Sequence, residues 1–148
     1  MIIRNSERGL HVILVDTSVF IDFLRGKDTV MTQTLDEICE LGLPVGFSAF
    51  TYMELLQGVK DEFEFETLRR DLCSYPIYYI EESEEKYRNI ARMYFNLRRK
   101  GVTPRNSIDL MIVATAIEYD MYLLHDDRDY DQIAPFFPKL KIWPKKVM

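Results

Sequence analysis

The chain has few cysteines, no stretch rich in glycine or proline, and no long apolar run. Its two cysteines, Cys39 and Cys73, stand in unrelated apolar segments without a partner at metal-ligand spacing. This excludes a disulfide framework and a cysteine metal site, and it predicts two buried free thiols. Six glycines and six prolines are scattered singly, so we expect neither a linker nor a disordered tail. One domain over residues 1–148 follows.

The longest apolar runs, at 11–15 and 109–117, are far shorter than the roughly 20 residues of a membrane-spanning helix. The first residues also lack the basic start, apolar middle and small-residue cleavage site of a secretory signal. We therefore expect a soluble, cytoplasmic protein with no membrane partner. The first ten residues precede the first predicted strand, either as a flexible arm or as an artefact of the assigned start.

The formal net charge is −5, whereas proteins that coat nucleic acid without sequence preference are usually strongly basic. This charge does not exclude a nuclease, because carboxylates gathered around metal ions can coexist with local basic patches that hold phosphates. The candidate phosphate-binding side chains are Arg98, Arg99, Lys100, Arg105 and Arg128. Net charge alone leaves the substrate open.

Short β-branched runs alternate with amphipathic segments along the chain. Strands are expected at 11–15, 44–48, 76–80, 121–124 and 140–143, and helices at 18–26, 30–41, 51–59, 62–73, 83–100 and 106–119. Ser18 and Asn106 are placed to cap the helices that begin at them, and three glycines to end helices: Gly26, Gly42 and Gly101. The alternation predicts an α/β sandwich around a parallel sheet.

The usual catalytic nucleophiles are sparse. The two histidines are His11 and His125, and His11 is expected at the surface or at a strand edge because it starts the first strand. No Gly-x-Ser-x-Gly elbow, Walker loop or dinucleotide-binding loop is present. The chemistry of this chain is therefore sought among its acids.

Acidic residues follow two of the predicted strands. Asp16 ends the first strand, and Asp126, Asp127, Asp129 and Asp131 follow the strand at 121–124. Ligand sites in open parallel sheets lie beyond the carboxyl ends of the strands, which is where these acids are expected. For Asp16, capping of the next helix is an equally good explanation.

Glu54 and Asp109 also fit a helix-start capping pattern. However, the residues after Asp109 are nearly all apolar, which indicates a helix buried all round whose start lies deep in the protein. Buried carboxylates need a counter-charge, and no lysine or arginine lies within three residues of Asp16, Glu54 or Asp109. A divalent cation such as Mg²⁺ would supply it and would activate a water for attack on phosphorus.

Four segments carry a family resemblance. They are Val-Asp-Thr-Ser-Val-Phe-Ile-Asp-Phe-Leu-Arg-Gly at 15–26, Ser-Ala-Phe-Thr-Tyr-Met-Glu-Leu-Leu-Gln-Gly at 48–58, Asp-Leu-Met-Ile-Val-Ala-Thr-Ala at 109–116, and Leu-Leu-His-Asp-Asp-Arg-Asp-Tyr-Asp-Gln-Ile-Ala at 123–134. In this order they resemble the acidic motifs of PIN-domain ribonucleases, and especially of VapC-type toxins of bacterial and archaeal toxin–antitoxin pairs.

The resemblance implies a three-layer α/β/α sandwich with a central, mainly parallel sheet and a Mg²⁺- or Mn²⁺-dependent endoribonuclease. The implied catalytic acids are Asp16, Glu54, Asp109 and Asp127, with Asp129 sharing or replacing the metal-binding role of Asp127. Hydroxyls of Thr17 and Ser18 would support the site or cap a helix, and Arg105 and Arg128 would contact RNA. His125 stands where the family often has threonine or serine, and Asp126 where it often has a basic residue.

An RNA substrate, a VapB-type antitoxin and a homodimer are the partners that the resemblance implies. Aromatic residues at Tyr52, Phe63, Phe65 and Tyr94 either form an antitoxin groove or pack in the core. One alternative function is an inactive PIN-like module that binds RNA or protein, against which all four acidic positions are filled. The other is a phosphotransfer domain with Asp16 as acceptor, against which Thr17 and the lack of an obvious lysine partner argue.

Overall fold

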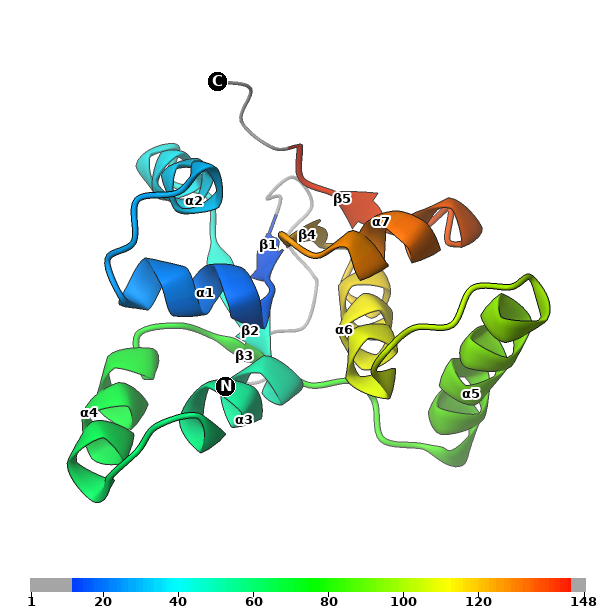
Figure 1. Cartoon of the computed structure of the whole chain (residues 1–148), viewed down its shortest axis with the longest axis horizontal. Coiled ribbons are helices and arrows are strands. Elements are labelled where there is room, and N and C mark those ends of the chain that lie inside the picture. Colours follow the sequence, from blue (N-terminus) through cyan, green and yellow to red (C-terminus); the bar gives the residue numbers. More distant parts are fainter. Residues whose placement is uncertain (1–11, 145–148) are drawn as a thin grey trace.

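A computed structural model of the chain describes residues 12–144, so the predictions for His11 and the first ten residues lie outside the described part. The strands found in this part are β1 (Ile13–Val15), β2 (Val45–Ser48), β3 (Ile77–Tyr78), β4 (Tyr122–Leu124) and β5 (Lys141–Ile142). They form a five-stranded sheet in the order β3-β2-β1-β4-β5, and every pairing is parallel. The first strand in the sequence is therefore the central strand of the sheet (Figure 1).

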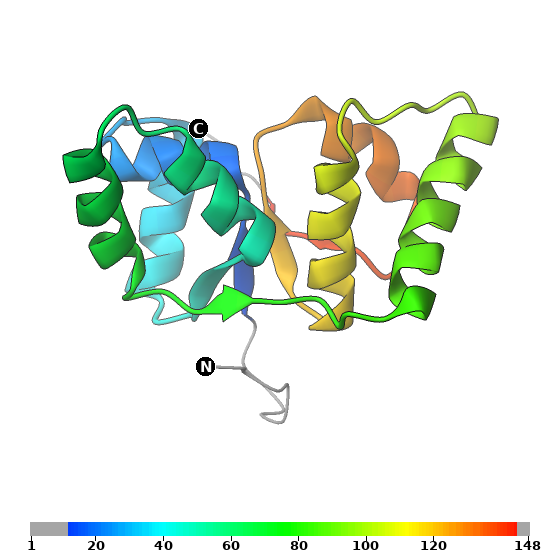
Figure 2. The same ribbon diagram turned by 90° about the horizontal axis from the view of Figure 1, so that it is seen from below.

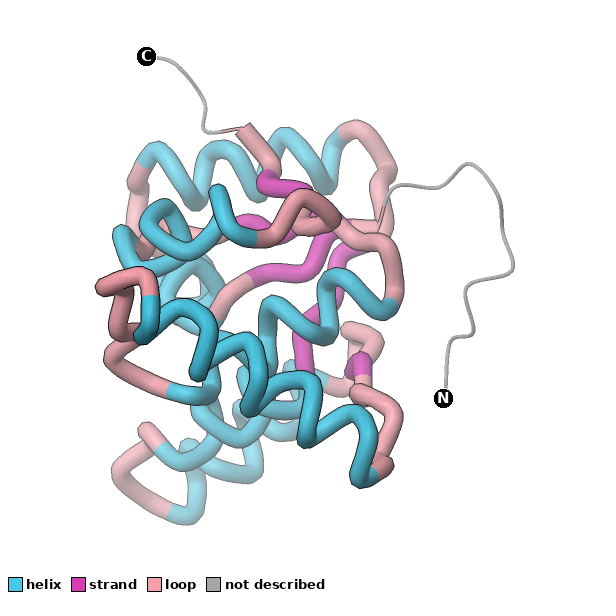
Figure 3. Tube along the Cα trace, turned by 90° about the vertical axis from the view of Figure 1, so that its right-hand side faces the viewer, coloured by secondary structure: helices cyan, strands magenta, loops and turns pink. Residues whose placement is uncertain are grey.

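Helices cover both faces of this sheet. They are α1 (Thr17–Leu24), α2 (Val30–Glu40), α3 (Ala49–Gln57), α4 (Glu62–Leu72), α5 (Glu84–Arg99), α6 (Ser107–Glu118) and α7 (Arg128–Ile133), with a short 3₁₀ turn at Ala134–Phe136. Figures 1 and 2 show α1 to α4 on one side of the strands and α5 to α7 on the other. In Figure 3, which faces the α5 side, the strands pass between helices. The expected three-layer α/β/α sandwich is confirmed.

The central strand alternates between two hydrophobic clusters. Ile13 and Val15 pack with residues of α1 and α2 such as Phe20, and Leu14 packs with residues of α6 such as Val113. All three residues of β1 are fully buried. A parallel sheet covered on both faces needs apolar side chains at successive positions, which explains the unbroken Ile-Leu-Val run.

Each expected strand and helix is present, with ends shifted by a few residues, and the glycine-terminated helices end as expected: Gly26, Gly42 and Gly101 have positive φ. The short helix α7 was not expected. None of the helices within 12–144 is long and apolar enough to cross a membrane.

The prediction that both cysteines are buried was wrong, because Cys39 and Cys73 are exposed. Leu35 and Ile38 are buried on the core side of α2, and Cys39 lies about 100° further round the helix. Cys73 follows the last residue of α4, at its C-cap. An apolar neighbour in the sequence is therefore no guide to burial in a helix.

Candidate active site

The carboxyl ends of the three central strands bring the acidic motifs together. Asp16 directly follows β1, Ser48 ends β2, and the 125–127 segment follows β4. Because β1 pairs with both β2 and β4 in parallel, these three ends lie at one edge of the sheet. This is the edge at which open parallel sheets place their ligand sites.

Asp16 is buried, with 6% of its surface exposed, and its carboxylate is held by two hydroxyls. Ser18 Oγ donates to Asp16 Oδ2 at 2.9 Å, and Tyr130 Oη donates to Asp16 Oδ1 at 2.8 Å. Asp16 occupies the N-cap position of α1, yet its side chain makes no capping hydrogen bond. Helix capping by the Asp16 carboxylate is therefore excluded as its role, and the prediction that Ser18 caps this helix was also wrong.

Tyr130, on α7, links two of the predicted acids. Its hydroxyl lies 3.4 Å from Asp109 Oδ1 as well as 2.8 Å from Asp16 Oδ1, and the residue is fully buried. Burial, and then the charges of Asp16 and Asp109, raise the pKa of Tyr130. The phenol therefore keeps its proton and can donate it in one hydrogen bond at a time. The shorter contact indicates that this bond goes to Asp16.

Sequence reasoning missed Tyr130 because it considered only the acids of the last motif. A usable signal was present: Tyr130 and Ile133 are the buried residues of α7 and lie three positions apart. That spacing places both on the inner face of a helix.

Glu54 is held by a second set of hydroxyls, contributed by α1 and α3. Thr17 Oγ1 donates to Glu54 Oε1 at 2.9 Å and lies 3.1 Å from Thr51 Oγ1. The cap of α3 is Ser48, whose hydroxyl accepts the Thr51 N–H, so Glu54 lies beyond the first turn and caps nothing. Thus Thr17 supports Glu54, whereas Ser18 supports Asp16.

Asp109 lies in the first turn of α6, which is capped by Asn106. The prediction that this helix starts deep in the protein was wrong, because Arg105, Asn106 and Ser107 are exposed and Asp109 is half-buried. The helix is apolar because its middle packs in the core, while its first turn remains at the rim of the site. Glu54 is likewise half-buried rather than enclosed.

The last acidic motif completes the cluster. One carboxylate oxygen each from Asp109, Asp127 and Asp129 lies within 4.8 Å of the other two. Asp127 caps α7 by accepting the Asp129 N–H at 2.9 Å, which holds these two acids together. Burial, followed by the charges of Asp16, Asp127, Asp129 and Glu54, raises the pKa of Asp109 to about 6.

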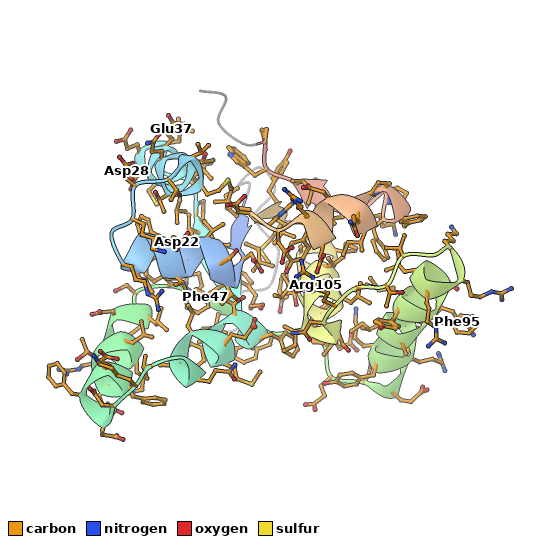
Figure 4. The ribbon with its side chains drawn as sticks, viewed as in Figure 1. Asp22, Asp28, Glu37, Phe47, Phe95 and Arg105 are labelled. Atoms are coloured by element: carbon orange, nitrogen blue, oxygen red, sulfur yellow. The ribbon has the colours of Figure 1, made fainter. Side chains whose placement is uncertain are left out.

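Two further predicted residues border the cluster. Arg105 donates to both oxygens of Asp129, at 3.0 and 3.4 Å, and Figure 4 shows it near the centre of the molecule. Arg128 is exposed at the start of α7. His125 is 2% exposed, and its Nδ1 accepts the Asp127 N–H at 3.2 Å, so the imidazole orients this loop from within the protein.

The donor set fits a divalent cation. Carboxylate oxygens are the ligands that Mg²⁺ and Mn²⁺ prefer. Three of them converge at Asp109, Asp127 and Asp129. Burial, and then the neighbouring negative charges, make the ionised form of Asp109 costly, which raises its pKa. A cation held by these carboxylates would offset that cost.

Residues 13–135 match the PIN domain family. The chain belongs to this family. It is 28% identical over 124 residues to VapC ribonuclease Mb1587 of Mycobacterium bovis, and equally to ribonuclease VapC11 of Mycobacterium tuberculosis; each alignment covers 83% of this chain and 92% of the relative. These matches agree with the family that the four acidic motifs indicated.

Solved structures show the same fold. VapBC2 from Rickettsia felis, bound to a DNA fragment from its promoter, aligns with a TM-score of 0.68 at 17% identity, over 89% of this chain and 97% of that chain. VapBC-1 from nontypeable Haemophilus influenzae aligns with a TM-score of 0.64 at 17% identity, over 89% and 96% of the two chains. Both likenesses concern the arrangement of the PIN domain.

Proposed function

We propose that this protein is a Mg²⁺- or Mn²⁺-dependent endoribonuclease that acts as the toxin of a toxin–antitoxin pair. The observation that carries the proposal is the acidic cluster at the edge of the sheet, in which carboxylate oxygens of Asp109, Asp127 and Asp129 lie within 4.8 Å of one another and the Tyr130 hydroxyl joins Asp109 to Asp16. The similarity to VapC ribonucleases supports RNA as the substrate.

In the proposed reaction, Asp16, Glu54, Asp109, Asp127 and Asp129 would hold the cation, which supplies an activated water and charge neutralisation at the phosphodiester. Ser18 and Tyr130 fix the Asp16 carboxylate, and Thr17 fixes that of Glu54, so the ligands are preorganised before substrate arrives. With a pKa of about 6, Asp109 would be mostly ionised at neutral pH.

Arg105 would contact the RNA backbone beside the acidic cluster. Its guanidinium lies beside Asp129 and its side chain is 78% exposed, so it can meet a phosphate that approaches from solvent. Arg128, exposed on the neighbouring helix, would provide a second contact of this kind. Both contacts recognise the RNA backbone and carry no base selectivity.

The proposed antitoxin would occupy a groove of about 390 Å³ between α1, α3 and α4. Its apolar lining includes Ile21, Leu24, Leu55 and Phe63, of which Phe63 is 77% exposed. Glu54 lines the same groove, so a segment bound there would reach the acidic cluster. The other aromatics, for which a groove or the core was expected, are half-buried and pack against the two hydrophobic clusters: Tyr52, Phe65 and Tyr94. The homodimer and the cytoplasmic location remain expectations.

Cleavage of total cellular RNA, with the new ends mapped by sequencing, tests this proposal. The wild-type protein should cleave RNA in Mg²⁺ or Mn²⁺, and EDTA should abolish the cleavage. The variants Asp16→Asn and Asp109→Asn should lose activity by at least about a hundredfold, because each substitution removes a charged ligand. Asp36→Asn, an exposed acid on α2, should cleave normally.

Circular dichroism would confirm that the three variants are folded. Unchanged cleavage by Asp16→Asn and Asp109→Asn would exclude these carboxylates from the reaction. Binding of RNA by the wild type without cleavage in either metal would instead favour the inactive module.

A further inference from the structure

Residues 86–107 carry seven cations and no acid, in a chain whose net charge is −5. Three of these cations form salt bridges: Lys86 with Glu118, Arg88 with Glu84, and Arg105 with Asp129. The remaining four are Arg92, Arg98, Arg99 and Lys100. They are exposed in the C-terminal half of α5 and at its C-cap, and no acidic side chain within 12–144 forms a salt bridge with them.

An aromatic ring lies in the middle of these charges. Phe95 is 38% exposed, and the guanidiniums of Arg92 and Arg99 lie over its ring at 5.4 and 5.6 Å from the centroid. Figure 4 shows Phe95 on α5, on the side of the molecule away from α1. We call Arg92, Phe95, Arg98, Arg99 and Lys100 the α5 basic patch.

The surface beside the patch is hollowed. A cavity of about 140 Å³ is lined by Arg92, Asn96, Lys100 and Phe136 among others, and Lys100 Nζ lies 5.0 Å from the centre of the Phe136 ring. Cations and aromatic rings therefore alternate across α5 and the 3₁₀ turn that follows α7. This turn comes directly after the helix that carries Asp129.

We propose that the α5 basic patch binds single-stranded RNA outside the acidic cluster. This inference rests on the proposed function. The four cations would contact phosphates, and Phe95, flanked by guanidiniums, would stack with a base. Arg105, five residues after Lys100, lies at the acidic cluster beside Asp129, so the chain that leaves the patch leads to the site. The patch would attract the polyanion that an acidic site by itself repels.

Two other occupants would also be attracted by this surface: an acidic protein segment and a second copy of this acidic chain. The solvent-accessible phenyl ring between arginines favours RNA, because a nucleobase offers a flat face for stacking at each phosphate repeat. Neither a carboxylate side chain nor the peptide backbone supplies that combination. The experiment distinguishes the three.

The test measures binding of a labelled single-stranded RNA oligonucleotide of random sequence to the full chain carrying Asp16→Asn, so that the RNA stays intact. Adding Arg92→Gln, Arg99→Gln and Lys100→Gln should reduce the slope of log Kd against log salt by about two, as expected for three lost phosphate contacts. Adding Phe95→Leu alone should weaken binding about tenfold and leave that slope unchanged, because stacking is not ionic.

Matched controls separate the patch from overall charge. Lys60→Gln, Arg70→Gln and Arg88→Gln together remove three cations that lie outside the patch, and Tyr87→Leu removes a 44% exposed aromatic at the opposite end of α5. Both controls should bind RNA within about twofold of the parent. Equal weakening by the patch and control triples would overturn the proposal.

Different results would contradict RNA binding by the patch and the proposed nuclease function. If the wild type cleaves RNA and the patch variants bind and cleave as it does, the patch has no part in RNA binding. A patch that instead binds polyglutamate more tightly than RNA would overturn the proposal in favour of an acidic protein segment. Loss of a dimer on gel filtration of the patch variants, with RNA binding unchanged, would overturn it in favour of a second copy.

Discussion

At the scale of single residues, the hydroxyl of Tyr130 is the contact that joins the first and third acidic motifs. Tyr130→Phe keeps the ring that packs against His125, at 4.8 Å between centroids, and removes only the donor to buried Asp16. We expect the free energy of unfolding to fall by about 1–3 kcal/mol in urea titrations, because a charged buried acceptor loses a hydrogen bond. Calorimetry should also show Mn²⁺ binding weakened about tenfold.

Tyr119→Phe is the control for this change. The Tyr119 hydroxyl donates to the Tyr79 carbonyl at 2.6 Å, away from the acidic cluster. This variant should lose stability and bind Mn²⁺ as the wild type does. If Tyr130→Phe also left Mn²⁺ affinity unchanged, Tyr130 would have a structural role only.

The positions of the acids could be predicted from the sequence, but their partners could not. Asp16 follows a short apolar strand, and parallel strands end at a common edge, which places it correctly. Thr17 and Ser18, one position apart on α1, point about 100° from each other, so one reaches Glu54 and the other Asp16. That choice depends on where α3 packs, which no local pattern encodes.

At the scale of elements, Gly46 determines how closely β2 approaches β3. A Cβ at this position would lie 2.6 Å from a ring carbon of Tyr78 and 2.8 Å from the carbonyl oxygen of Pro76. Because a backbone atom is involved, the strands would have to separate, and we expect Gly46→Ala to cost about 1–3 kcal/mol in chemical unfolding.

Gly58, at the C-cap of α3, is the matched control for Gly46. It has helical φ and ψ, and a Cβ there would meet its nearest atom at 3.6 Å. Gly58→Ala should be neutral or should stabilise the fold by up to about 1 kcal/mol, because the added methyl group lowers the conformational entropy of the unfolded chain. Equal stability of the two variants would show that β2 and β3 can adjust to the added methyl.

The elements themselves were predictable wherever apolar periodicity was strong. The exception is α7, whose six residues contain only two buried side chains among charged ones, Tyr130 and Ile133. An acidic run of this length has little local helix signal and forms a helix because Asp127 caps it and Tyr130 packs beneath it. The last motif was therefore located correctly but its shape was not.

At the scale of the whole molecule, two groups of like charge stand apart: the acidic cluster at the carboxyl edge of the sheet, and the four cations of the α5 basic patch, which form no salt bridge within 12–144. Burial, and then the charges of the neighbouring carboxylates, raise the pKa of Asp109 to about 6, so its ionised form costs folding free energy. The apolar core has to offset it when no cation is bound. Global stability should therefore depend on the charge of this one site.

The pH dependence has a definite sign. The pKa of Asp109 is about 6 in the folded protein, whereas the unfolded chain releases this proton near the usual aspartate pKa of 3.8. The folded state thus binds more protons between these values, so the contribution of Asp109 lowers stability as pH rises through this window and stays unfavourable above it. Asp109→Asn removes the charge and should stabilise the metal-free protein at pH 8.

We expect this gain to be about 1–2 kcal/mol at pH 8, less than the full shift implies because Asp109 is partly exposed to solvent. It should shrink to a small fraction of that value at pH 4, where Asp109 is protonated in the folded protein and about half ionised in the unfolded chain. Urea unfolding in EDTA at pH 4, 6 and 8 measures it. Adding Mn²⁺ at pH 8 should reverse the order, because the wild type gains binding free energy that the variant largely lacks. A difference between the two proteins that stayed constant from pH 4 to pH 8 would contradict the assignment of the raised pKa to Asp109.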